Sequence, residues 1–122
     1  MSDWAVLQSI AEEVVAAAIA SLPAEFKREA EGLPVTYDPR PDEALRHLDL
    51  DGTLGLFVGP SRLDPDGEAE VVPPQIILFL VNIWQFAEGK ERIYRHEVRT
   101  TYLHELGHYF GLEEIDLEKN GL

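Results

Sequence analysis

The pattern of apolar and polar positions predicts a helix near the start of the chain. Apolar residues recur there every three or four positions, with polar and acidic residues between them: Trp4, Leu7, Ala11, Val14, Val15, Ala18 and Leu22. This spacing gives an amphipathic helix one apolar face, and Ser2 or Asp3 is suited to cap its start. Pro23 suits the first turn of a second, short helix that runs to about Glu31 and stops at Gly32.

Three stretches in the middle of the chain are typical of strands. They are "LPVTYDP" (33–39), "TLGLFVG" (53–59) and "PPQIILFLVN" (73–82). The last is the most apolar run in the chain, and its β-branched and aromatic content favours a strand. The next seven residues, "IWQFAEG", fit either a helical turn or a loop.

The segments between these strands are more polar. "PDEALRHLDLDG" (41–52) predicts one or two helical turns before an Asp-Gly turn, and "LDPDGEAE" (63–70) predicts an acidic loop. From Lys90 the pattern becomes helical again, and Gly111 is a natural end for this last helix. One broad face of the last helix carries Ile93, Glu97, Thr100, His104 and His108, and another carries Val98, Tyr102, Leu106 and Tyr109.

These elements predict an α+β fold. We expect a small mixed sheet of about three strands, packed against two long helices and several short ones. Strands and helices do not alternate along the chain as they would in a doubly wound fold. A length of 122 residues suits one domain, so we expect residues 1–122 to form a single domain.

Composition and charge exclude several classes of protein. The chain is 45% hydrophobic and 27% charged, as in globular proteins, and its lack of cysteine excludes disulfides and thiolate metal sites. A formal net charge of −13 disfavours nucleic acid as a partner. The N-terminus does not resemble a secretory signal, and no apolar run reaches the roughly 20 residues that span a bilayer. We therefore expect a cytoplasmic protein that binds neither membranes nor nucleic acid; its oligomeric state stays open.

The sequence "LHELGHYFGLEE" (103–114) carries the candidate chemistry. His104 and His108 lie one helical turn apart, so both imidazoles can bind one zinc ion at about 2.0–2.1 Å. Glu105 lies about 100° around the helix from His104. It is therefore badly placed as a third ligand and well placed as the general base for a metal-activated water.

A catalytic zinc ion needs a third protein ligand. Gly111 tolerates a positive φ, which lets the chain turn back towards the metal. The next acids are Glu113, Glu114 and Asp116. We expect Glu114 to be the ligand, with Glu113 and Asp116 as alternatives.

The extended motif is unlikely to arise by chance. Shuffling this composition gives His-Glu-x-x-His in about one chain in a hundred, and the extended motif in about one in several thousand. The competing interpretation is a surface helix with two solvated histidines.

"HELGHYFGLEE" resembles the extended motif H-E-x-x-H-x-x-G-x-x-D/E of the small bacterial zincin-like metallopeptidase family. The order of the stretches "LGLFVG", "PPQIILFLVN" and "EVRTTYLHELGHYFGL" is also similar to that family. The resemblance implies a minimal single-domain zinc metallopeptidase in which His104, His108 and Glu114 bind Zn²⁺ and Glu105 is the general base. Its substrate would be a peptide or a protein.

The chain differs from the metzincins, which have histidine where this chain has Glu114. It also has no methionine after the motif, so it cannot form a Met-turn. With eight residues after Glu114, we expect a cleft that is shallow or completed by a partner. Two alternatives to a peptidase stay open: a metal-binding interaction module with little or no proteolytic activity, and a metal-dependent hydrolase acting on something other than a peptide, such as a small amide.

Four other residues are of a type that could assist the chemistry. His96, Tyr94, Tyr102 and Tyr109 are candidates for an oxyanion donor, although none is favoured over the others. His47 is expected at the surface. The resemblance also implies that the strand around Ile76–Val81 lies near the last helix; if that strand is a sheet edge, it could pair with an extended peptide.

Overall fold

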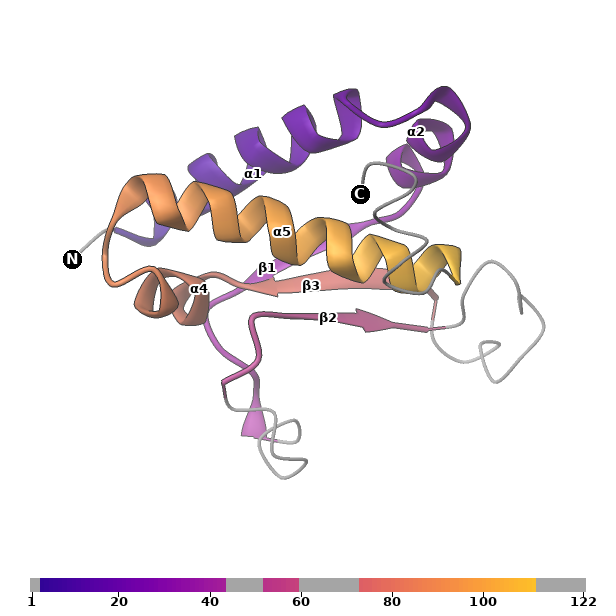
Figure 1. Cartoon of the computed structure of the whole chain (residues 1–122). Coiled ribbons are helices and arrows are strands. Elements are labelled where there is room, and N and C mark those ends of the chain that lie inside the picture. The colour runs from indigo at the N-terminus through magenta and orange to yellow at the C-terminus, as the bar shows by residue number, and fades with distance from the viewer. Residues whose placement is uncertain (1–2, 44–51, 60–72, 112–122) are drawn as a thin grey trace.

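The structure is a computed structural model that describes residues 3–43, 52–59 and 73–111 (Figure 1). Within these ranges the chain forms four helices of at least seven residues and three strands. They are α1 (Trp4–Ala20), α2 (Ala24–Glu31), β1 (Val35–Asp38), β2 (Gly55–Val58), β3 (Gln75–Phe79), α4 (Leu80–Phe86) and α5 (Glu91–Phe110). The predicted α+β fold with two long helices is confirmed. Both N-terminal helices lie where the apolar pattern puts them, although Pro23 precedes α2 as its N-cap residue.

The sheet is mixed, and its central strand is β3. The strand order is β1-β3-β2, with β1 parallel and β2 antiparallel to β3. The expectation that the strand at Ile76–Val81 could be an edge is therefore wrong. The apolar sequence of β3 matches its central place, where it is paired on both sides. Its residues Ile76 and Leu78 are fully buried. The edge strand beside α5 is β2, and no other described strand pairs with it.

The third predicted strand is shorter than its apolar run. Extended pairing stops at Phe79, and Leu80 begins α4 without an intervening loop. Leu80 and Ile83 are both fully buried, three positions apart, so the core takes up this segment at helical spacing. Residues 80–82 are thus helical, and the ambiguous stretch that follows them continues the helix to Phe86.

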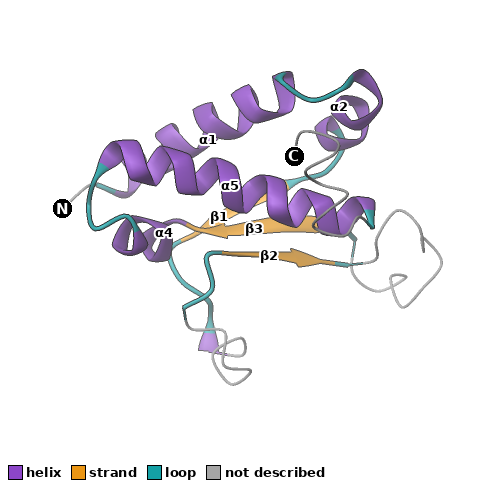
Figure 2. Cartoon of the chain, viewed as in Figure 1, coloured by secondary structure: helices purple, strands orange, loops and turns teal. Residues whose placement is uncertain are grey.

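Helices α1 and α5 lie side by side over the sheet (Figures 1 and 2). Helix α5 contacts α1, α4, β2 and β3, so it is the central element of the core. Its buried face carries Tyr94, Val98, Tyr102, Leu106 and Phe110, all of them fully buried. Of the described residues, no helix is both long and apolar enough to cross a membrane.

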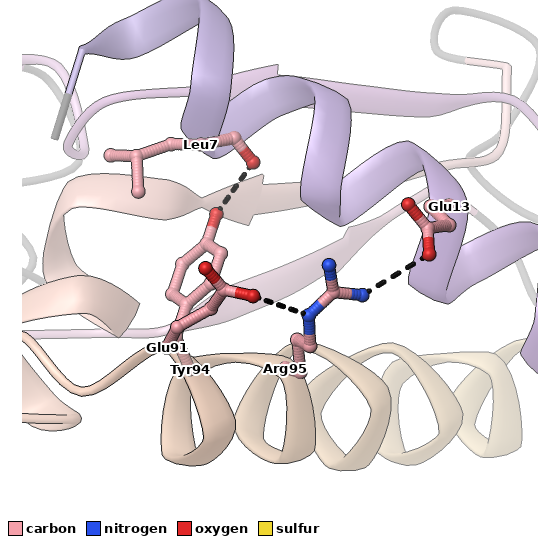
Figure 3. A network of polar contacts seen from close by, with 5 residues as sticks. All are labelled: Leu7, Glu13, Glu91, Tyr94 and Arg95. Carbon is pink, nitrogen blue, oxygen red and sulfur yellow. Dashed lines mark hydrogen bonds and ion pairs between the residues drawn. The ribbon is translucent and has the colours of Figure 1, made fainter.

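Polar contacts also join α1 to α5 (Figure 3). The buried Tyr94 hydroxyl donates a hydrogen bond of 2.8 Å to the Leu7 carbonyl oxygen. At the surface, Arg95 pairs with Glu13 of α1 at 3.3 Å and with Glu91 of its own helix at 3.1 Å. Exposed ion pairs contribute little to stability, so the buried Tyr94 contact and the apolar face hold α1 in place.

Strand β2 approaches α5 closely because residue 55 is glycine. A Cβ atom at Gly55 would lie 2.6 Å from the Thr101 Cγ2 atom and 3.2 Å from a Leu78 methyl group. No side chain fits there without a shift. A glycine in a strand often marks such a close approach, and here it brings the backbone of β2 against the helix. The start of β2 is also fixed by Asn82, whose side-chain amide donates to the Thr53 carbonyl oxygen at 2.9 Å.

Replacing Gly55 should therefore weaken the packing of β2 on α5. We expect Gly55→Ala to lower the free energy of unfolding by about 1–3 kcal/mol, as overpacking does, measured by urea denaturation. Gly52→Ala is the matched control, because its added Cβ has nothing within 4 Å. Thr101→Ser removes the clashing methyl group and should restore part of the loss in Gly55→Ala. An unchanged stability in Gly55→Ala would contradict the close approach.

Two buried tyrosines should respond differently to loss of the hydroxyl. Tyr94→Phe leaves the Leu7 carbonyl without its donor and should cost about 1 kcal/mol of stability. Tyr102 is fully buried, and its hydroxyl has no hydrogen-bond partner among the described residues. Tyr102→Phe removes a desolvated polar atom, so its free energy of unfolding should not fall. Equal losses in the two variants would contradict this.

Candidate metal centre

The motif residues lie near the C-terminal end of α5. The helix ends at Phe110, and its C-cap residue Gly111 has φ 73° and ψ 27° in the left-handed region. This confirms the prediction that Gly111 ends the helix, since only glycine adopts that conformation without strain. The positively charged ion expected at the site would lie in the last turns of α5, where the helix dipole favours a cation.

Burial of one face of α5 presents the other face to solvent. Leu106 and Phe110 are fully buried, whereas His104 and His108 are exposed and Glu105 is half-buried. The 3.6-residue period accounts for this, because residues 104 and 108 point away from the face that packs on the sheet. The apolar pattern therefore sets the direction of both imidazoles.

The two histidines are spaced as ligands of one ion. Their Nε2 atoms lie 3.3 Å apart, and their rings stand almost perpendicular, at 83°. Two nitrogens that are each about 2.0–2.1 Å from a tetrahedral zinc ion lie about 3.3 Å apart. The same distance allows one imidazole to donate a hydrogen bond to the other. The donor set of two imidazoles beside a carboxylate suits zinc, so the residues present fit the expected metal.

Glu105 completes the cluster. One ligand atom from each of His104, Glu105 and His108 can be chosen such that all three lie within 4.8 Å of one another. The Glu105 carboxylate also accepts a hydrogen bond from the backbone N–H of Phe57 in β2, with 2.9 Å between Oε1 and nitrogen. Strand β2 thus fixes one carboxylate oxygen of Glu105 beside the two imidazoles.

The contacts of β2 with α5 repeat along both elements. Residues 101 and 105 are one helical turn apart, a rise of about 6 Å, and residues 55 and 57 are about 6.6 Å apart along a strand. The Gly55–Thr101 approach is therefore followed, in register, by the Phe57–Glu105 hydrogen bond. The ring of Phe57 then contacts the ring of Tyr109 at 5.8 Å between centroids.

Helix α2 holds the same end of α5 from another side. The rings of Phe26 and Phe110 lie 4.7 Å apart, and the Tyr109 hydroxyl donates to the Glu29 carboxylate at 3.2 Å. The helix end that carries the cluster is thus packed against both a strand and a helix. This packing fixes the position of the helix end from which both imidazoles extend.

Several residues predicted from the sequence fall outside the described ranges. Glu114 and its alternatives Glu113 and Asp116 are among them, as is His47. The third ligand therefore stays a prediction. Most of the segment 41–52, for which the sequence predicts one or two helical turns, also lies outside the described residues (44–51), as does the acidic loop in 63–70.

None of the candidate oxyanion donors has a free group at the site. Tyr94 and Tyr102 are fully buried in the core, and Tyr109 already donates to Glu29. His96 is exposed and lies 3.5 Å from the Thr100 hydroxyl, two turns before His104 along the helix. The described residues offer the site one backbone donor that sequence reasoning missed, the Phe57 N–H. The glycine within "TLGLFVG" was the signal that β2 comes close to the helix.

Comparison with known proteins gives one family match. A family model described as zincin-like metallopeptidase matches residues 30–122, which include β1, β2, β3, α4 and α5 and the whole motif. No curated protein matches the chain. The match covers most of the sequence and both elements that build the cluster, so the chain belongs to the zincin-like metallopeptidase family.

Proposed function

We propose that the protein is a zinc-dependent peptidase. The observation that carries this proposal is the His104–Glu105–His108 cluster, with its 3.3 Å spacing between imidazole nitrogens and a carboxylate beside them. When bound, zinc would lower the pKa of a water molecule towards about 7 and polarise a carbonyl group. His104 and His108 would hold the ion, together with Glu114.

Glu105 is the proposed general base. Its carboxylate is half-buried and close to both imidazoles, so it is within reach of a water molecule next to them. Glu105 would take a proton from the attacking water and then deliver it to the nitrogen of the leaving amine. A single carboxylate can do both because the peptide nitrogen becomes basic once the carbonyl carbon is tetrahedral.

The proposed substrate is a peptide in extended conformation. Strand β2 is an edge strand among the described elements and lies directly beside Glu105. Edge strands bind extended peptides through backbone hydrogen bonds, which is compatible with little sequence preference. The net charge of −13 favours basic peptides, because opposite charges speed the encounter.

The second candidate is a metal-binding interaction module with little or no proteolytic activity. It is favoured by one observation: no hydroxyl of Tyr94, Tyr102 or Tyr109 is available to stabilise an oxyanion. Against it stands Glu105, because a structural metal site needs no base in that position. The two candidates differ in turnover, not in metal content.

Metal content should depend on the histidines and not on the base. We expect about one zinc ion per chain, measured by elemental analysis of protein prepared without a chelator or a histidine tag. His104→Ala and His108→Ala should each abolish it, because two protein ligands rarely hold zinc. Glu105→Gln should retain it. Loss of zinc in Glu114→Ala would identify the third ligand; a wild-type protein that fails to bind added zinc would refute the proposal.

Hydrolysis should require Glu105. We expect zinc-loaded wild type to cleave fluorescein-labelled casein, and Glu105→Gln to lose about 10²–10⁴-fold in rate while keeping its zinc. Glu97→Gln is the matched control, because it makes the same change two turns earlier on α5. Equal residual activity in Glu105→Gln and wild type would exclude the base role, and zinc binding without any cleavage would favour the interaction module.

A further inference from the structure

The hydrogen bond between Phe57 and Glu105 uses a donor on the open edge of β2. In an antiparallel pair, successive residues point their backbone groups alternately towards and away from the partner strand. The Leu54 carbonyl oxygen accepts from Phe79 N at 2.9 Å, so residue 54 faces β3. Residue 57 is three positions further on and faces away, as its bond to Glu105 confirms.

An added peptide strand would need that same donor. Strand addition to an edge uses the outward N–H and C=O groups of alternate residues. On β2 these belong to Gly55 and Phe57. The Phe57 N–H already donates to the Glu105 carboxylate, and a charged acceptor makes this bond stronger than a neutral one.

We propose that the Phe57 N–H is a positioning group for Glu105, and that a peptide strand bound to the β2 edge takes this N–H and frees the carboxylate. The inference rests on the proposed function, since it concerns how substrate engages the same site. Before a peptide binds, Glu105 is held against the sheet. When a peptide carbonyl accepts the Phe57 N–H, the carboxylate is free to accept a proton beside the two histidines.

The close contact at Gly55 makes this exchange possible. Because β2 touches α5 at Thr101, the next outward donor falls within hydrogen-bonding distance of the carboxylate one turn later. A strand held further from the helix would leave Glu105 and the edge independent of each other. A peptide bound at the β2 edge thus releases the Glu105 carboxylate from its hydrogen bond, and this exchange involves no change in the fold.

A binding measurement can test the competition without any cleavage. The probe is a fluorescein-labelled ten-residue peptide of alternating lysine and valine in which every second amide is N-methylated. Such a strand keeps one hydrogen-bonding edge, because alternate residues point the same way, and N-methylated amides resist peptidases. Fluorescence anisotropy gives its dissociation constant for each zinc-loaded variant.

Two matched backgrounds isolate the N–H. Phe57→Ala and Phe57→Pro both lose the ring, but only Phe57→Pro loses the donor. Proline is tolerated on an edge strand where the N–H faces away from the ladder. Glu105→Ala is then added to each background. In the Phe57→Ala background, Glu105→Ala should tighten peptide binding by about 5-fold, the value of one hydrogen bond. In the Phe57→Pro background, the same change should tighten binding by less than about 2-fold.

An equal change in the two backgrounds would overturn the inference, because any effect of charge alone is the same in both. Failure of every variant to bind the probe would also overturn it. Failure to bind would also remove β2 as the proposed peptide-binding edge, but neither outcome decides whether the protein is a peptidase, which casein cleavage tests separately. Conversely, unequal changes in a protein that cleaves nothing would support the inference and refute the peptidase.

Hydrogen exchange on the zinc-loaded wild type avoids the proline variant altogether. The Phe57 amide proton should exchange slowly, and Glu105→Ala should speed its exchange by about 5-fold or more. Adding the probe to Glu105→Ala should slow it again. Exchange at Phe57 that is the same in wild type and in Glu105→Ala would overturn the inference.

Discussion

The Gly55–Thr101 contact brings one strand and one helix close enough to share a hydrogen bond, and the candidate site depends on it. A helical turn and two strand residues rise by nearly the same distance. Contact at Gly55 therefore recurs as a contact at Phe57, where the backbone N–H meets the Glu105 carboxylate at 2.9 Å. A side chain at position 55 would meet the Thr101 methyl group, so the strand or the helix would have to shift at this point.

Helix α5 contributes both to the core and to the candidate site, because its two faces have different neighbours. The face with Val98, Tyr102 and Leu106 is fully buried, and the opposite face carries the two histidines. Anything that rotates the helix to repair its packing also moves the imidazoles. The neighbouring helices limit such rotation: the Tyr94 hydroxyl is bonded to α1 near the start of α5, and Phe110 packs on Phe26 of α2 at its end.

Local patterns predicted much of the fold and most of the described cluster. The 3.6-residue period predicted α5 and the direction of its histidines, and Gly111 marked the helix end. The extent of β3 could not be predicted, because a fully apolar run has no period to separate strand from helix at Leu80. Its central place in the sheet follows from pairing between distant segments, which one sequence does not encode locally. The Phe57 contact could not be predicted for the same reason: it joins a backbone N–H to a side chain 48 positions away.

The proposed function requires that the two histidines of α5 hold zinc beside Glu105. X-ray absorption at the zinc edge of the metal-loaded protein tests it most directly, because scattering from imidazole rings is distinctive. We expect two imidazole nitrogens at about 2.0–2.1 Å, with oxygen ligands completing the shell. His104→Ala and His108→Ala should each remove this signature, and Glu105→Gln should leave it unchanged. A zinc shell without imidazole scattering, or one that both histidine variants retain, would contradict the account.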